Sequence, residues 1–177
     1  VTLSSPTKTF NAAGLHASYV LVESPALRAR YAAVVMHTHG AFGSAFANVA
    51  LEACYTVEGA RWLGAALELI RGNVDAVMAF CAKRAPRLRP VRPEAGYLIW
   101  VDCSGLGLES AALKRLFVHG ARVLPSFGDE FGPEGDCGHF VRLNVACPRA
   151  RVERALLQIE EAVNALPNSL PNGAGAG

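Results

Sequence analysis

A stripe of apolar residues in the middle of the chain constrains the fold more than any other feature. Its members repeat at alternating spacings of four and three residues, the period of one face of an α-helix. They are Leu63, Leu67, Ile70, Val74, Val77 and Cys81. Gly72 interrupts the helix at a cost of about 1 kcal/mol relative to alanine, so we expect a bend or a close packing contact there. The pattern predicts one long helix with a single buried face.

The residues before this helix predict a strand and two helices. Residues 18–22 are a β-branched and aromatic run that predicts a short buried strand. Ser24 and Pro25 then form a helix start, with serine as the N-cap and proline in the first helical position. After a break at residues 40–43, a second helix is expected over about residues 44–55.

The residues after Pro86 predict short strands alternating with helices. Strands are expected at residues 97–101, 121–124 and 140–145, and helices at residues 109–119 and 149–166. The last helix buries Val152, Leu156, Ile159, Val163 and Leu166. This alternation predicts a small α+β unit, and Pro, Gly, Ala and Asn in residues 167–177 indicate a disordered tail.

Charge and cysteine usage exclude several kinds of protein. The net charge is only +2, and the densest basic segment, residues 83–92, is broken by prolines, so it indicates a solvated linker rather than a nucleic-acid surface. The five cysteines lack the CxxC spacing of zinc sites and are odd in number, which favours buried thiols over a disulfide framework. No apolar run approaches the roughly 20 residues that span a bilayer, and no signal peptide is evident, so we expect a cytoplasmic protein with no membrane partner.

Lys8 is the main candidate for chemistry. It is a lone lysine within SSPTKTFNAAGL, residues 4–15, where hydroxyl-bearing residues precede it and Gly14 follows. A catalytic lysine needs an amine that can lose its charge and condense with an aldehyde. Nearby hydroxyls suit phosphate oxygens, and Gly14 would allow a close turn of the backbone. A surface lysine in a polar turn has the same composition.

Three segments carry a resemblance to a known family. Residues 4–15, RPEAGYLIWVDCS at residues 92–104 and GDEFGPEGDCGHFVRLNVACPR at residues 128–149 resemble segments of fold-type I pyridoxal-phosphate (PLP) enzymes. They are similar to the lysine segment, the small-domain strand entry and the carboxylate-binding strand. The family is the aminotransferase class I/II superfamily, and the closest likeness is to its cystathionine beta-lyase (MalY/PatB-type) branch.

The resemblance implies a fold class and an organisation. The expected fold is α/β, the C-terminal part of a PLP-dependent transferase fold. Residues 1–60 would be the remnant of the large domain, 61–85 an interdomain helix, and 86–166 the α+β small domain. The phosphate loop, the stacking aromatic and the acid that pairs with the pyridine nitrogen would lie upstream, so the chain is expected to be the C-terminal half of an enzyme that is a homodimer at full length.

The resemblance also assigns site residues around PLP. Lys8 matches the lysine that binds the cofactor and moves the proton at the substrate α-carbon, while the cofactor acts as the electron sink. Ser5 matches a position whose hydroxyl reaches the cofactor phosphate, and Thr7 is a second candidate beside a turn-forming role. His16 stands where aminotransferases carry a phosphate-binding arginine. This favours a lyase, although a loop histidine explains it equally well.

Arg142 matches the arginine that binds the substrate α-carboxylate. Its planar guanidinium can donate two parallel hydrogen bonds to a carboxylate. Strand alternation places Phe140, Arg142 and Asn144 on one face, opposite Val141, Leu143 and Val145. A structural salt bridge with an acidic residue is the alternative, because an unpaired charge is costly to bury.

No metal site is expected. His37 and His39 are two residues apart but have no nearby carboxylate or cysteine, and the glycine-rich loop around Asp129, Glu130 and Asp136 does not fit the EF-hand pattern. That loop is expected near the substrate entrance. Arg149 is expected at the surface where the last helix begins.

The resulting expectation is a PLP-dependent carbon–sulfur lyase that acts on a small amino-acid substrate. It would release a thiol, pyruvate and ammonia by β-elimination from cystathionine or a cysteine-like compound. Two alternatives remain at this point. One is a class I/II aminotransferase, and the other is a non-catalytic fragment or packing module.

Overall fold

The computed structural model describes residues 1–38, 40, 44–133 and 137–167. The backbone contacts divide the chain into two compact units, Val1–Leu67 and Glu68–Gly177. We call them unit 1 and unit 2. The division falls within the longest helix, α3 (Val57–Arg84), which contributes to both. The predicted domain limits near residues 60 and 86 remain predictions, and the predicted tail lies almost entirely outside the described residues.

Unit 1 begins with two short strands followed by helices. Strands β1 (Thr2–Ser4) and β2 (Tyr19–Leu21) pair antiparallel, and a single 3₁₀ turn, Ala13–Leu15, lies between them. Helix α1 (Pro25–His37) begins as predicted, because Ser24 Oγ accepts the Leu27 N–H at 3.4 Å. Helix α2 (Ala45–Cys54) follows with Ser44 as its N-cap.

The apolar residues of unit 1 are mostly exposed. Only Pro6, Ala17 and Ala47 are buried among its described residues. The prediction that the strand at residues 18–22 is buried is therefore wrong: Leu21 is 59% exposed, because β2 pairs only with the exposed β1. Other exposed large side chains of the unit include Leu3, Tyr31, Val34, Met36, Phe46, Val49, Tyr55 and Trp62.

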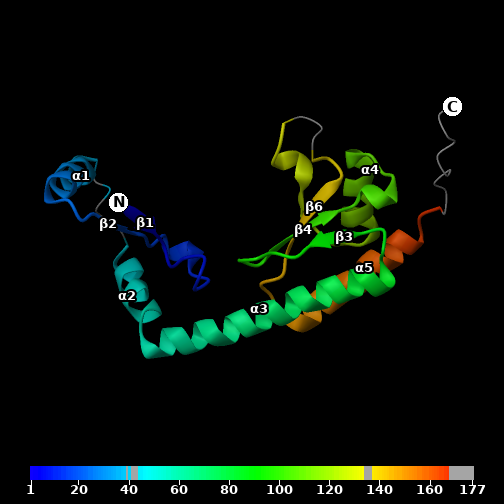
Figure 1. Cartoon of the computed structure of the whole chain (residues 1–177), viewed down its shortest axis with the longest axis horizontal. Helices are drawn as coiled ribbons and strands as arrows, with labels where there is room; N and C mark the ends of the chain where they lie inside the picture. Colours follow the sequence, from blue (N-terminus) through cyan, green and yellow to red (C-terminus); the bar gives the residue numbers. More distant parts are fainter. Residues whose placement is uncertain (39, 41–43, 134–136, 168–177) are drawn as a thin grey trace. The chain divides into compact units, whose positions relative to one another are not determined.

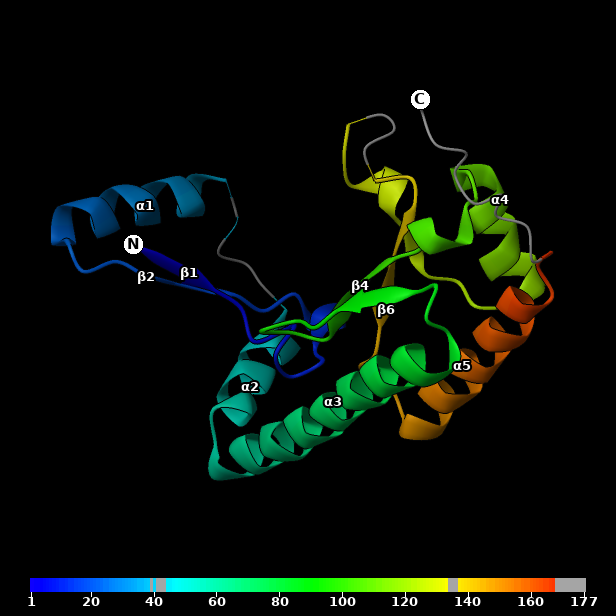
Figure 2. The ribbon, with the colours of Figure 1, turned by 45° about the vertical axis from the view of Figure 1, so that its right-hand side comes forward.

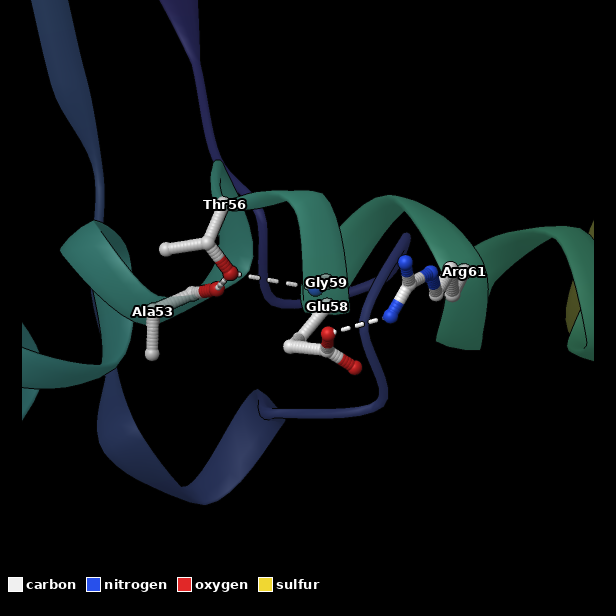
Figure 3. A network of polar contacts seen from close by, with 5 residues as sticks. All are labelled: Ala53, Thr56, Glu58, Gly59 and Arg61. Atoms are coloured by element: carbon white, nitrogen blue, oxygen red, sulfur yellow. Dashed lines mark hydrogen bonds and ion pairs between the residues drawn. The ribbon is translucent and has the colours of Figure 1, made fainter.

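A tight corner joins α2 to α3, and Figure 3 shows its contacts. The Thr56 hydroxyl donates to the Ala53 carbonyl at 2.8 Å and accepts the Gly59 N–H at 3.1 Å, so one side chain serves the end of one helix and the start of the next. A Cβ on Gly59 would lie 2.1 Å from the Cys54 carbonyl oxygen. The corner therefore requires glycine at this position.

The long helix α3 follows the predicted stripe, but burial is concentrated in its second half. Val74, Val77 and Cys81 are buried, whereas Leu67 is 41% exposed. The predicted close contact at Gly72 is confirmed. A Cβ there would lie 2.7 Å from the guanidinium of Arg149.

Unit 2 is a four-stranded antiparallel sheet with helices packed on one face. The strand order is β3 (Arg89–Val91), β4 (Leu98–Asp102), β6 (Phe140–Asn144) and β5 (Ser126–Phe127). Helices α4 (Ser110–Arg115), which continues into a π turn at Leu116–Gly120, and α5 (Arg149–Asn164) complete it. Figures 1 and 2 show α5 beside the second half of α3, where Arg84 pairs with Glu160 at 2.6 Å.

The core of unit 2 lies between the sheet and these helices. The predicted buried face of the strand at residues 140–145 is confirmed, since Val141 and Val145 are at most 2% exposed. The last helix buries Val152, Leu156, Ile159 and Val163 as predicted, whereas Leu166 lies beyond the end of α5 and is half-buried. The fully buried large side chains here include Val77, Ile99, Val101, Leu113, Phe117 and Val141. Asn73 is also 0% exposed, and its amide donates to the carbonyls of Val145 at 2.8 Å and Cys147 at 2.9 Å.

Two sequence predictions in unit 2 are wrong. Residues 121–124 form no strand: Arg122 has a left-handed φ of 54° and Pro125 lacks an N–H, so pairing begins only at Ser126. Residues 83–92 are not a linker, because the first two end α3 and Arg89–Val91 pairs with β4. None of the helices in the described ranges is long and apolar enough to cross a bilayer.

Candidate active site

Lys8 lies in a hydrogen-bonded turn of unit 1. The Phe10 N–H donates to the Pro6 carbonyl and the Ala12 N–H to the Thr7 carbonyl, each at 2.8 Å. Pro6 is buried, whereas the Lys8 side chain is exposed. No carboxylate of the described residues lies within 4.0 Å of its amine. The amine is therefore presented on a hydrogen-bonded turn and has no ion-pair partner in the part of the chain that the structure describes.

The hydroxyls of Ser5 and Thr7 form a small network beside the lysine. Ser5 Oγ donates to the Ala17 carbonyl at 2.6 Å and accepts the Thr7 N–H at 3.2 Å. The two hydroxyl oxygens are 2.7 Å apart. Since Ser5 has only one hydroxyl hydrogen, Thr7 is the donor between them. A phosphate that takes a hydrogen bond from Ser5 must therefore replace the Ala17 carbonyl as its acceptor.

His16 occupies a strained turn rather than a regular element. Its φ is 50°, in the left-handed region, and its side chain is exposed. Asn11 has a similar φ of 53°. Gly14 lies in the middle of the 3₁₀ turn at Ala13–Leu15, but a Cβ there would meet nothing within 4 Å, so the turn does not require glycine.

An aromatic cluster that the sequence analysis missed holds this segment. The Phe10 ring stacks on Trp62 with centroids 6.1 Å apart and meets Tyr55 edge-on at 5.8 Å. The hydroxyls of Tyr19 and Tyr55 are 3.2 Å apart. A hydrogen bond with Ser4, and then the bond with Tyr55, lower the pKa of Tyr19, while the same bond with Tyr19 raises the pKa of Tyr55. The cluster connects the lysine turn to the start of α3.

Arg142 is half-buried on the open face of the sheet in unit 2. Its guanidinium donates to Ser126 Oγ at 3.1 Å and its Cζ lies 4.3 Å from the centroid of the Phe131 ring. Within the described residues no carboxylate lies within 4.0 Å of it. The alternative of a structural salt bridge therefore has no partner in that part of the chain. The guanidinium is oriented by a hydroxyl and a ring and keeps donors for an anion.

Aromatic residues surround Arg142. Trp100 is its direct cross-strand partner on β4. The Trp100 ring stacks on Phe140 with centroids 5.3 Å apart and meets Phe131 edge-on at 5.8 Å. Alternation along β4 could have placed Trp100 on this face, but its pairing with Arg142 depends on register, which the sequence does not give.

The acidic loop after β5 does not form a cation site in its described part. Asp129 accepts from Lys114 at 2.7 Å and from Ser110 at 2.8 Å, and the lysine contact is the main reason that its pKa is lowered. Asp136 and His39 lie outside the described residues. The described ranges contain no group of three or more residues able to hold a metal ion.

Four of the predicted site residues lie within unit 1, and the fifth lies within unit 2. Ser5, Thr7 and Lys8 share one turn, with His16 at the end of the following 3₁₀ turn. Arg142 belongs to unit 2. The residues present are compatible with parts of a PLP site: an accessible amine beside hydroxyls, and an oriented guanidinium that has no carboxylate partner among the described residues.

Comparisons with known proteins identify related sequences and structures. PatB of Bacillus subtilis (strain 168), a cystathionine beta-lyase, is 34% identical over 164 residues, which are 93% of this chain and 42% of PatB. Cystalysin from Treponema denticola, whose structure contains PLP, matches with a TM-score of 0.81 and 28% identity over 92% of this chain and 40% of its own. The PLP-bound C–S lyase from Staphylococcus hominis gives a TM-score of 0.74, 27% identity and coverages of 92% and 42%.

These matches establish the class and then the family. The mixed helices and sheet are part of the fold of PLP-dependent transferases, as the resemblance implied. Residues 1–159 match the family described as Aminotransferase class I and II, and the chain belongs to that family. It spans about two fifths of the length of the curated relatives that it matches (42% of PatB and of MalY of Escherichia coli).

Proposed function

We propose that this chain supplies the lysine and the carboxylate-binding arginine of a PLP-dependent carbon–sulfur lyase. The reaction is β-elimination from cystathionine or a cysteine-like thioether, giving a thiol, pyruvate and ammonia. The observation that carries the proposal is the environment of Arg142, which is half-buried and oriented by Ser126 and Phe131, and has no carboxylate partner within the described residues. The names of PatB and of the S. hominis lyase support the reaction.

Arg142 binds the substrate through its α-carboxylate. The Ser126 hydroxyl accepts one N–H, and the Phe131 ring covers one face of the guanidinium. Its remaining N–H groups can donate a parallel pair of hydrogen bonds to the two carboxylate oxygens. This fixes the orientation of the amino acid before any bond is broken.

Lys8 holds the cofactor aldehyde and moves the proton at the substrate α-carbon. PLP, when bound, withdraws electrons from that carbon, which is the chemistry that the protein itself lacks. The exposed amine of Lys8 has no ion pair to break among the described residues. The hydroxyls of Ser5 and Thr7 are the proposed donors to the cofactor phosphate.

His16 favours the lyase over the aminotransferase. An arginine there would add a fixed positive charge for the phosphate, whereas a histidine donates at most one hydrogen bond when it is neutral. The family as a whole includes aminotransferases, so this activity is the second candidate. In that case Lys8 would return its proton to the cofactor, and no thiol would leave.

The exposed apolar surface of unit 1 indicates how such an enzyme is completed. Phe46 is 75% exposed, Val49 66% and Trp62 47%. Surfaces of this kind mark contacts with other protein. Because the chain spans only 42% of PatB, we propose that activity requires the remaining part of such an enzyme, assembled as a homodimer.

The test begins with cofactor binding to Lys8. PLP is added to the chain as it stands and to a longer gene product if one exists, and the visible absorption band is recorded before and after borohydride. We expect a band that borohydride removes, with PLP fixed on the peptide that contains Lys8. The variant Lys8→Ala should abolish the band, and Lys83→Ala, at another exposed lysine, should not. A band that survives in Lys8→Ala would refute the assignment.

Activity then separates the two candidates. Thiol release from cystathionine is compared with transfer of an amino group to a keto acid. Thiol and pyruvate in equal amounts support the lyase, and amino transfer without thiol supports the aminotransferase.

A further inference from the structure

Four arginines line one cavity of unit 2. The cavity has a volume of about 530 Å³ and lies among α5, β6 and residues 122–126. The arginines are Arg122, Arg142, Arg151 and Arg154. Ligand sites for small molecules usually have volumes of roughly 300–1,000 Å³. The cavity is therefore large enough for a metabolite, and its ionised lining groups all have one sign.

The positive charge of this cavity is not compensated locally. Aspartate and glutamate are absent from its described lining. Within the described residues none of the four guanidinium groups lies within 4.0 Å of a carboxylate oxygen. Elsewhere in the same unit, Arg84 and Arg92 do pair with acids. Like charges around one concave surface raise the local concentration of anions.

The backbone at Arg122 adds an independent observation. Its φ of 54° is rarely adopted by a residue with a Cβ. The conformation is held in place because the next residue, Val123, donates its N–H to the Phe117 carbonyl at 2.9 Å. Strained residues of this kind gather at binding sites. Here the strain replaces the strand expected at residues 121–124 and leaves Arg122 on the cavity wall.

The remaining lining residues define the class of ligand. Leu124, Pro125, Val152 and Ala155 give the wall an apolar part, and Gln158 is a neutral hydrogen-bonding group. We infer that this cavity binds a small multivalent anion with a short hydrocarbon or ester part, either a di- or tricarboxylate or a phosphorylated metabolite. Three of its four arginines have no role in the proposed lyase reaction, so the site stands whether or not that reaction does.

Calorimetric titration of the full chain tests this site with two probes. Citrate represents the carboxylate source and pyrophosphate the phosphate source, both at fixed ionic strength. We expect one saturable site, weakened about 100-fold in the double variant Arg151→Gln/Arg154→Gln, because each lost charged contact is worth about tenfold. The control Arg71→Gln/Arg115→Gln removes the same charge from exposed arginines outside the cavity, and it should weaken binding less than about threefold, as expected for screened charges.

Thermal unfolding without probe shows whether the double variant is still folded, so that a loss of binding can be assigned to the cavity. Arg151 and Arg154 are exposed, and removing them relieves repulsion, so the double variant should melt at or above the temperature of the parent chain. Binding of citrate alone, or of pyrophosphate alone, identifies the source of the anion. The site is refuted if neither probe binds saturably, or if the control loses as much affinity as the cavity variant. Since PLP is absent throughout, failure here leaves the Lys8 experiment unaffected.

Discussion

Replacing Asn73 should destabilise unit 2 more than replacing an exposed asparagine would. The side chain is 0% exposed and donates to the carbonyls of Val145 and Cys147, so it fixes the connection between β6 and α5. Asn73→Ala removes both hydrogen bonds and leaves the Val145 carbonyl buried without a donor. Each such bond contributes about 1 kcal/mol and a stranded buried acceptor costs about 1–3 kcal/mol.

Two features of the structure reduce this cost. The Cys147 carbonyl is only part-buried and can regain water, and Asn73 Oδ1 has no hydrogen-bond partner in the described structure, so its removal is favourable. The net expectation is a loss of about 2 kcal/mol in the free energy of unfolding. Urea unfolding followed by tryptophan fluorescence measures it, with Asn164→Ala at an exposed position as the control.

The variant Asn73→Asp adds a pH dependence with a definite sign. A buried carboxyl that faces two carbonyls has a raised pKa, since only its protonated form can donate. Its stabilising contribution is therefore present below the unfolded pKa of about 3.9 and is lost as pH rises. Asn73→Asp should lie closer to the parent chain at pH 4 than at pH 8. If the stability of Asn73→Ala stays within about 0.5 kcal/mol of the parent, the range of an ordinary surface change, the two hydrogen bonds of Asn73 do not stabilise unit 2 as expected.

Further outcomes follow from one close contact in unit 1 and from two buried thiols in unit 2. Gly59→Ala should lower the free energy of unfolding by about 2 kcal/mol or more, because its Cβ would overlap the Cys54 carbonyl oxygen. The control Gly64→Ala, whose Cβ would meet nothing within 4 Å, should instead stabilise α3 by up to about 1 kcal/mol. Equal effects of the two variants in urea unfolding would contradict the geometry of the corner. Burial raises the pKa of Cys81 from 9.0 to about 11 and that of Cys103 from 9.0 to about 12. Both should therefore resist alkylation in the folded chain at pH 8, as mass spectrometry of digests can show. The protonated thiols contribute their full stabilisation below pH 9, and this stabilisation is lost as pH rises through 11 to 12. A free energy of unfolding that stays constant above pH 9 would contradict the raised pKa of these two thiols.

The sequence predicted most helices because their signals are local. The N-cap at Ser24 and the apolar stripe of α3 are set by residues within a few positions of one another. A strand was predicted at residues 121–124 because the residues there are mostly apolar, and this prediction is wrong. The left-handed φ at Arg122 is a tertiary feature that no periodicity reports.

The candidate site was predictable only in part for a similar reason. Lys8, Ser5 and Thr7 are adjacent in the chain, so one motif located their shared turn. Ser126 and Phe131 bind Arg142 through pairing and loop geometry, which the sequence does not encode in a short pattern. The roles of Lys8 and Arg142 remain predictions, and the cofactor experiment tests the first of them.

The two edges of the sheet in unit 2 limit how this unit can associate. One edge, β3, contains Pro90, which offers no N–H, and the other, β5, is only two residues long and follows Pro125. Such edges cannot template a continuous ladder with a second chain, which is the route to fibres and to dimers built by strand addition. Copies of unit 2 at high concentration should therefore resist amyloid-type growth through this sheet, and association through unit 2 should use side-chain surfaces rather than sheet extension.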